Sequence, residues 1–437
     1  MITPKSVLLE SEEDFVELPP HELWMTFIKN VHDIPDALDL DKFQTALSRT
    51  LEIYPHACGR LVKETNERGM SCWKIRLTKS TIPLEIVESE GLPKFTDSVI
   101  QDDLAPLLPR TDFDVVNADN ALISLKLHVS AQRTIIGVAW HHTLGDAATL
   151  LRFLTTFSEY YEGHEPDIGS LPVFKKHHFS DPSPAEIQKW LPHMSHLACT
   201  YSAAEIQVKY NEGNEPTVPI RAIIKRSDAE AIRRRAQAEQ NSNRGLTISL
   251  QDALSATVVA AINRSYPNSV RRVTNAAGYR QVNAEWNLPN VAGNSIYIVS
   301  TRDFDAVFSQ DIGYVAAMIR KSLLEARKAE YVAGYMSVAS HQMALAAENN
   351  EQFFFGSDRS TLSVNSNLIF DWQSIGFGCS NTRFYTPGIT RFYLRIFLAN
   401  PSSTLSKGEA LDLTFGAPAS MRSGIIEQLG SDFMIVQ

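Results

Sequence analysis

The chain has 437 residues, which is more than one hydrophobic core usually serves, so we expect two domains. Apolar residues make up 44% and charged residues 21%, the balance of an ordinary globular protein. The net charge of −9 argues against the basic surface that nucleic-acid binding requires, and we expect no nucleic-acid partner.

The sequence shows no export or membrane signal. Residues 1–5 run straight into the acidic stretch 10–14 without the apolar core of a signal peptide. It contains no run of about 18 uninterrupted apolar residues, so we expect no transmembrane helix and no membrane partner. The four cysteines lack C-x-x-C spacing, which is typical of reduced thiols. These features predict a cytoplasmic protein.

Two kinds of hydrophobic periodicity alternate along the chain. Apolar residues at helical spacing predict helices over 23–32, 40–53, 146–161, 227–240, 249–264 and 311–347. Runs of β-branched and aromatic residues predict strands over 121–129, 134–140, 218–225, 295–301 and 391–398. Ser227 and Glu230 have the spacing of a capping box at the start of the fourth helix. Because helices and strands interleave, we predict an α/β or α+β class with large mixed sheets.

A weakly patterned stretch lies near the middle of the chain. It begins at Ser180-Asp-Pro-Ser-Pro184 and ends at 211–216, which is rich in Asn, Gly and Glu. On each side lies a block with its own predicted strands and helices. We therefore predict an N-terminal domain over 1–178, a connection over 179–216 and a C-terminal domain over 217–437.

The run His142-Thr-Leu-Gly-Asp146 is the first candidate for chemistry. Residues 135–140 read as a buried strand that ends at His141, and a predicted helix follows Asp146. Imidazole has an unperturbed pKa near neutrality, so His142 could take a proton from a hydroxyl or an ammonium. Two fixed positions fit equally well a buried structural histidine followed by a helix-capping aspartate. His141, one residue earlier, is expected to face the opposite way because strand side chains alternate.

Further blocks support a catalytic interpretation of this run. Residues 38–61 contain L-S-R-T-L followed by Y-P-H-A-C-G-R-L, residues 275–280 read N-A-A-G-Y-R, and residues 288–294 read L-P-N-V-A-G-N. Together with the strands and helix of 122–161, these blocks resemble, in order and spacing, the signatures of the BAHD acyltransferases. The resemblance extends over nearly the whole chain and is closest to the microbial secondary-metabolite branch.

The resemblance implies a fold and a reaction. The expected fold has two similar domains, each a mixed β-sheet flanked by helices as in chloramphenicol acetyltransferase, with a channel at their interface. Acyl-CoA, by default acetyl-CoA, would be the co-substrate, with no permanently bound cofactor, and a small molecule the acceptor. His142 would deprotonate a hydroxyl or amine that attacks the thioester directly. Asp146 would pair with Arg280 in a structural role, and the protein would be a monomer.

Two signatures of the family are altered here. The D-F-G-W-G loop has its best match in Ser374-Ile-Gly376-Phe377-Gly378, which lacks the leading aspartate. In the family this loop supports the channel and the domain interface. A threonine that can stabilise the oxyanion in relatives is replaced at the matching position by Asn365, whose amide is the candidate donor.

Two other interpretations remain open. His177 and His178, followed by His193, His196 and Cys199, have a spacing that could form a zinc site, although the family uses no metal. The altered second signature also fits a protein that kept the fold but lost transfer. Such a protein would be a CoA-independent cyclase or isomerase, or a binding protein.

Overall fold

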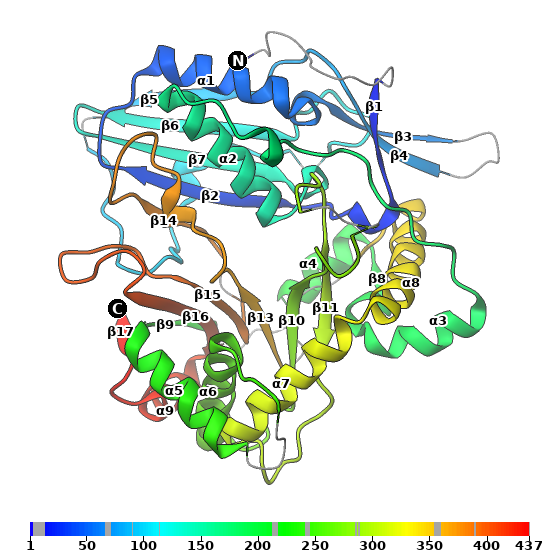
Figure 1. The fold of residues 1–437 in the computed structure, drawn as a ribbon, viewed down its shortest axis with the longest axis vertical. Helices are drawn as coiled ribbons and strands as arrows, with labels where there is room; N and C mark the ends of the chain where they lie inside the picture. The colour runs from blue at the N-terminus through cyan, green and yellow to red at the C-terminus, as the bar shows by residue number, and fades with distance from the viewer. Residues whose placement is uncertain are drawn as a thin grey trace.

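The computed structural model describes residues 1–2, 14–65, 71–89, 91–112, 114–211, 217–240, 245–284, 286, 289–353, 360–388 and 390–436. Two large sheets, one in each half of the chain, carry most of the strands (Figure 1). Helices and strands interleave along the chain, so the predicted mixed α/β class is confirmed. In the part of the chain described, no helix is both long enough and apolar enough to cross a bilayer.

The first sheet has five strands in the order β14-β2-β7-β6-β5. Their bounds are Arg383–Tyr385, Phe27–Ile34, Arg133–His141, Ile123–Ser130 and Leu84–Glu88. Helices α1 (Leu40–Ile53) and α2 (Ala147–Glu162) share one hydrophobic core with this sheet. The Trp140 ring on β7, for example, lies 5.2 Å from the Phe153 ring on α2. This packing fixes the end of β7, where the histidine run begins.

The second sheet has seven strands in the order β11-β10-β13-β15-β16-β9-β17. Their bounds are Ile296–Ser300, Arg272–Gly278, Thr361–Ser366, Tyr393–Leu398, Ala410–Pro418, Thr217–Lys225 and Met434–Val436. Four helices lie with it in the lower half of Figure 1: α5 (Arg226–Glu239), α6 (Leu250–Ser265), α7 (Ile312–Ala326) and α9 (Arg422–Leu429). Leu362 and Val364 of β13 point into their core, so Asn365 points to the other face.

Smaller elements complete the fold. Strands β1 (Phe15–Leu18), β4 (Ser71–Arg76) and β3 (Arg60–Thr65) form a three-stranded sheet, and β8 (Thr200–Tyr201) pairs with β12 (Gln352–Phe353). The predicted connection contains β8 and two helices, α3 (Pro184–Trp190) and α4 (Ala203–Asn211), and its residues 212–216 lie outside the described residues. The long helix α8 (Ala329–Glu348) packs on α3.

The two halves exchange segments. Strand β14, from the C-terminal half, pairs antiparallel with β2 of the first sheet. In the other direction, the segment around Val99 reaches the second sheet, where the Val99 amide donates to Asp412 at 2.9 Å. Arg221 on β9 donates to the carbonyl of Ile100 at 3.1 Å. These reciprocal contacts hold the two sheets in one arrangement.

The structure differs from the sequence predictions in three places. Residues 23–32 contain strand β2 and not a helix, because β2 lies between two other strands and its buried positions include both polar and apolar residues. The range 311–347 is two helices, α7 and α8, separated by Arg327 and Lys328. Helix α5 begins at Arg226, so Ser227 lies inside it and no capping box forms there.

Candidate active site

The histidine run occupies a tight loop between β7 and α2. His141 ends β7, a single 3-10 turn spans His142–Leu144, and α2 begins after Asp146. The His142 amide donates to the Thr26 carbonyl at 2.7 Å, and the Trp140 indole donates to the Gly145 carbonyl at 2.9 Å. These bonds fix the loop backbone from both sides, so His142 leaves the strand in one direction.

Gly145 has a backbone conformation that other residues rarely adopt. Its φ is +137°, and a Cβ atom there would lie 2.6 Å from the Cβ of Thr149. We expect Gly145→Ala to lower the free energy of unfolding by about 1–3 kcal/mol, measured by chemical denaturation. Gly163, at the other end of α2, is the matched control because its φ is +86° but no atom lies within 4 Å of its Cβ position. Equal losses in the two variants would contradict a steric role for Thr149.

The side chain of His142 is oriented by Asn294. Asn294 Nδ2 donates to the His142 carbonyl at 2.7 Å and to the Glu22 carbonyl at 3.2 Å. This fixes the amide with Oδ1 toward His142 Nδ1, at 2.7 Å. Because Oδ1 can only accept, the ring proton lies on Nδ1 and donates to it. Nε2 is then left with a free lone pair, as a general base requires.

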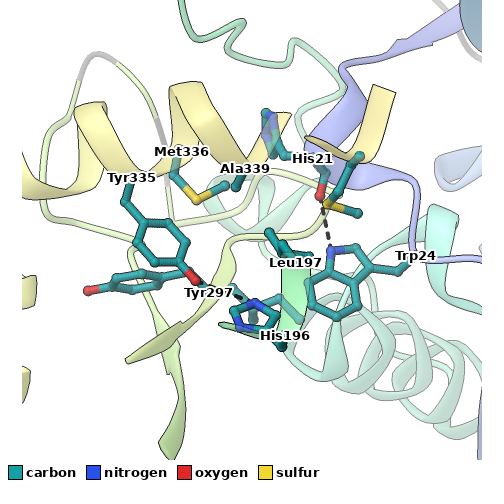
Figure 2. A pocket seen from close by; sticks show the side chains of 10 residues that line it. His21, Trp24, His196, Leu197, Tyr297, Tyr335, Met336 and Ala339 are labelled. Carbon is teal, nitrogen blue, oxygen red and sulfur yellow. Dashed lines mark hydrogen bonds between the residues drawn. The ribbon is translucent and has the colours of Figure 1, made fainter. Parts of the chain in front are cut away.

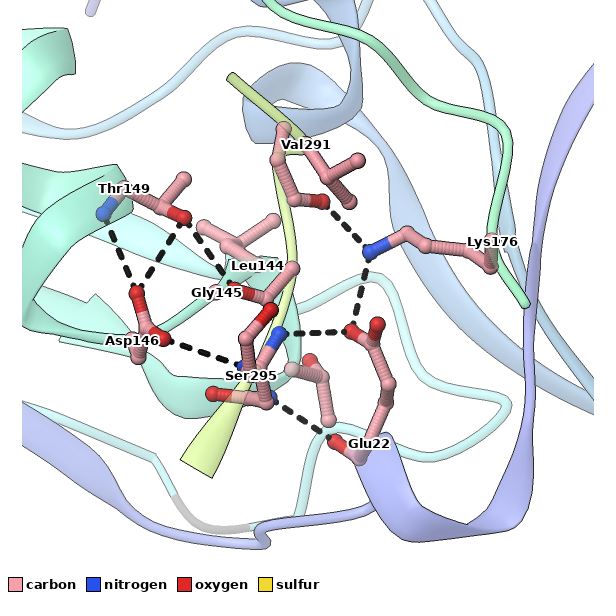
Figure 3. A network of polar contacts seen from close by, with 12 residues as sticks. Glu22, Leu144, Gly145, Asp146, Thr149, Lys176, Val291 and Ser295 are labelled. Atoms are coloured by element: carbon pink, nitrogen blue, oxygen red, sulfur yellow. Dashed lines mark hydrogen bonds and ion pairs between the residues drawn. The ribbon is translucent and has the colours of Figure 1, made fainter. Parts of the chain in front are cut away.

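Asp146 faces a different set of partners. Its Oδ2 accepts from Arg280 Nη1 at 2.5 Å and from the Ser295 amide at 3.1 Å, and its Oδ1 accepts from the Thr149 amide at 3.2 Å and caps α2. Figure 3 shows Asp146 between Thr149 and Ser295. Arg280 Nη2 also donates to the Gly293 carbonyl at 2.8 Å. The pair thus joins the histidine loop to the segment that carries Asn294.

Burial and these partners set the charge states. Burial lowers the pKa of His142 below its ordinary 6.5, although Asp146 and the hydrogen bond with Asn294 act in the opposite direction. For Asp146, burial raises the pKa, but the Arg280 charge and the hydrogen bonds outweigh it, so the net pKa is lowered below 3.8. At pH 7 the imidazole is therefore neutral and Asp146 is ionised.

A small pocket is lined in part by Trp24, the residue that stacks on His142. The Trp24 ring stacks on the His142 ring, with centroids 5.8 Å apart, and its Nε1 donates to the His21 carbonyl at 3.0 Å. Figure 2 shows this pocket. Trp24 lines it together with Leu197, Met336 and Tyr335, among others. The space open to the centre of a water-sized sphere is about 10 Å³, room for about one water molecule. A larger guest would have to displace Trp24 or its neighbours.

Three other histidines of the sequence analysis, His141, His177 and His196, contact residues away from Asn294. His141 is buried, its Nδ1 lies 2.7 Å from the Thr143 hydroxyl, and its ring packs edge-on against Phe27. His177 stacks on Trp286, and His196 Nε2 lies 3.4 Å from the Tyr335 hydroxyl. Across the described ranges, no three His, Cys, Asp or Glu side chains gather as metal ligands would. The zinc interpretation therefore has no site there.

The structure does not bring Asn365 into hydrogen bonding with this cluster. Asn365 Nδ2 donates to the Tyr393 hydroxyl at 2.9 Å, and its Oδ1 accepts from Asn367 at 3.1 Å. One amide hydrogen of Asn365 remains beyond the bond to Tyr393. Its side chain lies on the face of the second sheet that is turned away from α6 and α7.

The loop 374–378 packs on the outer helices of the first half. The Phe377 ring lies 5.6 Å from Phe43 on α1 and 5.0 Å from Phe157 on α2, and its amide donates to the Ser158 hydroxyl at 2.8 Å. Ser374 and Gly378 are exposed, whereas Gly376 is buried. The loop thus attaches the C-terminal half to α1 and α2, just before β14.

Four residues at the site were not predicted as site residues. Trp24 and Glu22 precede β2, and Trp24 lies in the range 23–32 that was predicted as a helix. Lys176 is 154 positions from Glu22 in the chain. Asn294 was noticed only as the last residue of a turn motif, whose first residue, Leu288, lies outside the described residues. The only sequence signal for Asn294 was its place in the Gly293-Asn294 pair that ends this turn motif.

Comparison with known proteins extends these observations. The model of the Transferase family matches residues 3–415. No curated protein sequence matches the chain. Among solved structures, TRI101 of F. sporotrichioides, complexed with coenzyme A and T-2, is similar with a TM-score of 0.69 and 12% identity over 95% of this chain and 97% of that one. Vinorine synthase gives 0.64 and 14%, over 98% and 96%.

Another solved structure, with a lower TM-score, is named for a different reaction. The epimerization domain from the third module of tyrocidine synthetase B gives a TM-score of 0.56 and 14% identity, over 98% of this chain and 96% of that one. At such identities the likeness shows the fold alone. The fold is thus the two-domain mixed α/β architecture that these structures share.

Proposed function

Because the chain belongs to the Transferase family, the BAHD acyltransferases, we propose that it moves an acetyl group from coenzyme A to a hydroxyl or amine, with His142 as general base. Membership makes the protein an acyltransferase that uses acyl-CoA as co-substrate and a small molecule as acceptor. The acetyl group, a secondary metabolite as acceptor and the role of His142 are our proposal. TRI101, complexed with coenzyme A and the small molecule T-2, supports the substrate classes by analogy.

One observation carries the assignment of the base. The bond between His142 Nδ1 and Asn294 Oδ1 leaves Nε2 unprotonated at pH 7. Nε2 takes the proton of the acceptor as the acceptor oxygen or nitrogen attacks the thioester carbonyl. The tetrahedral intermediate then collapses, and the C–S bond breaks. The imidazolium returns the proton to the departing thiolate, so His142 ends the cycle neutral.

Two further groups have proposed roles. Asn365, which retains one amide hydrogen, would donate to the oxyanion of the intermediate, an interaction whose loss typically raises a barrier by about 3–4 kcal/mol. Asp146 and Arg280 would hold the histidine loop and not touch substrate, because the Asp146 oxygens are already bonded to Arg280, Ser295 and Thr149.

The remaining proposals concern context. The loop with Ser374, Gly376, Phe377 and Gly378 would support the interface between halves, consistent with the packing of Phe377 on α1 and α2. The domain boundaries at 178 and 217, a cytoplasmic location and a monomeric state are proposed from the sequence. We also propose from the sequence that the protein binds no cofactor permanently.

The loop that matches the D-F-G-W-G signature begins with Ser374 and not with aspartate, and this change favours a second candidate function. A cyclase or isomerase that uses His142 without coenzyme A would keep the fold and lose acyl transfer. The similarity to an epimerization domain is consistent with such a change of chemistry on one fold.

Acceptor-dependent release of free thiol tests the proposal. The protein is incubated with acetyl-CoA and a panel of hydroxylated and amino secondary metabolites, and products are identified by mass. We expect thiol release that requires both an acceptor and the protein. If free thiol were released faster from an acyl-CoA with a longer chain, that acyl group would replace acetyl in the proposal. Conversion of an acceptor without any acyl-CoA would favour the cyclase or isomerase.

A further inference from the structure

A second buried ion pair lies beside the histidine loop. Glu22 Oε2 and Lys176 Nζ are 2.9 Å apart, and their side chains are only 4% and 3% exposed. Figure 3 shows this pair on the opposite side of the loop segment from Asp146. Burying two charges is costly, and replacing such a pair by apolar residues is often neutral or stabilising. A reason other than stability is therefore needed for its presence.

The pair holds the backbone on either side of Gly293. Glu22 Oε2 accepts from the Asn294 amide at 3.1 Å, and Lys176 Nζ donates to the Ala292 carbonyl. A Cβ at Gly293 would lie 2.3 Å from Lys176 Nζ, so only glycine admits the pair this close. On the other side, Arg280 binds the Gly293 carbonyl. Two ion pairs thus hold the segment 292–294 from opposite sides.

The segment 292–294 determines which ring nitrogen of His142 carries the proton. Asn294 Oδ1 keeps the ring proton on Nδ1, whereas a free neutral imidazole in water prefers the proton on Nε2. Glu22 contacts Asn294 twice, through its carboxylate and through its backbone carbonyl. A shift of Glu22 would therefore move both the amide and the backbone of Asn294.

We infer that Glu22 and Lys176 are positioning residues, whose ion pair fixes Asn294 so that His142 is held as the Nδ1–H tautomer with Nε2 directed to act as base. The catalytic consequence rests on the proposed function, whereas the tautomer does not. Neither residue touches the reacting atoms in this arrangement. They act on His142 only through Asn294.

Nitrogen NMR of histidine-labelled protein measures the tautomer directly. The chain has 12 histidines, and His142 is identified by the signals that disappear in His142→Gln. We expect wild-type His142 to carry its proton on Nδ1. A proton on Nε2 in the wild-type protein would overturn the inference, whatever the activity.

The double variant Glu22→Gln with Lys176→Met removes both charges and leaves no lone one. We expect part of the His142 signal to change to the Nε2–H form, and kcat to fall about 10- to 100-fold with the KM for acyl-CoA little changed. Glu22→Asp, which keeps the charge but shortens the reach, should show a smaller change in the same direction. A wild-type tautomer and kcat in either variant would contradict the proposed role.

The matched control is another buried ion pair. Asp252 on α6 and Arg320 on α7 are 2.6 Å apart, with side chains 0% and 19% exposed, and the pair joins two helices that pack together beside the second sheet. Asp252→Asn with Arg320→Met should lower stability but leave the tautomer and kcat unchanged. A tautomer change in this control would mean that general destabilisation explains the effect. If the expected tautomers appear but His142→Ala retains turnover, the proposed role of His142 as base fails, and only the tautomer part of the inference stands.

Discussion

Replacing His142 with alanine is expected to lower kcat by about 10²- to 10⁴-fold while leaving the fold intact. Nε2 of His142 is the atom that the Asn294 bond leaves free to accept a proton, and alanine has no equivalent. The loop backbone is held by the bonds of the His142 amide to Thr26 and of the Trp140 indole to Gly145, so removal of the side chain should leave the fold intact. Initial rates of thiol release at saturating acetyl-CoA and acceptor measure the effect.

The pH dependence gives a second measure of the same assignment. Because burial lowers the pKa of His142 below 6.5, the base is already unprotonated at pH 7. We expect kcat/KM of the wild-type protein to be flat near pH 7 and to fall only below pH 6.5, as the ring becomes protonated. The control for His142→Ala is His141→Gln. The His141 ring contacts Thr143 and Phe27, so this variant should retain turnover. Undiminished turnover in His142→Ala would exclude it as the base.

The sequence was sufficient where periodicity was strong. The helices predicted over 40–53 and 146–161 lie within one residue of α1 and α2, because each buries one apolar face against a sheet. Strand β2 was missed since it is covered on both faces: Asn30 and His32 are buried on one side and Val31 on the other, so no alternation remains. Its flanking residues happen to repeat at helical spacing.

The site divides in a similar way. His142, Asp146 and Arg280 were found because each lies in a block with a fixed local pattern, and the structure places Asp146 and Arg280 in direct contact. Glu22 and Lys176 have no such pattern, because their partnership depends only on how distant segments pack. The orientation of Asn294 likewise depends on two backbone carbonyls that no sequence motif records.

The Asp146→Asn variant is expected to lose about 3–5 kcal/mol of unfolding free energy, together with activity. Asparagine can still cap α2, but it leaves the Arg280 guanidinium buried without a counter-charge. The double variant with Arg280→Met should lose less than the sum of the two single variants, because no lone charge remains. Chemical denaturation of the four proteins provides the cycle.

The sign of the pH dependence follows from the lowered pKa of Asp146. A carboxylate whose pKa in the folded state is below its unfolded value adds stability that is complete above the unfolded value, about 3.9. That contribution disappears as the pH falls through the folded value. The stability difference between wild type and Asp146→Asn should therefore be equal at pH 7 and pH 5 and shrink only below about pH 4. If the variant lost activity but kept wild-type stability at pH 7, Asp146 would act in catalysis and not in holding the loop.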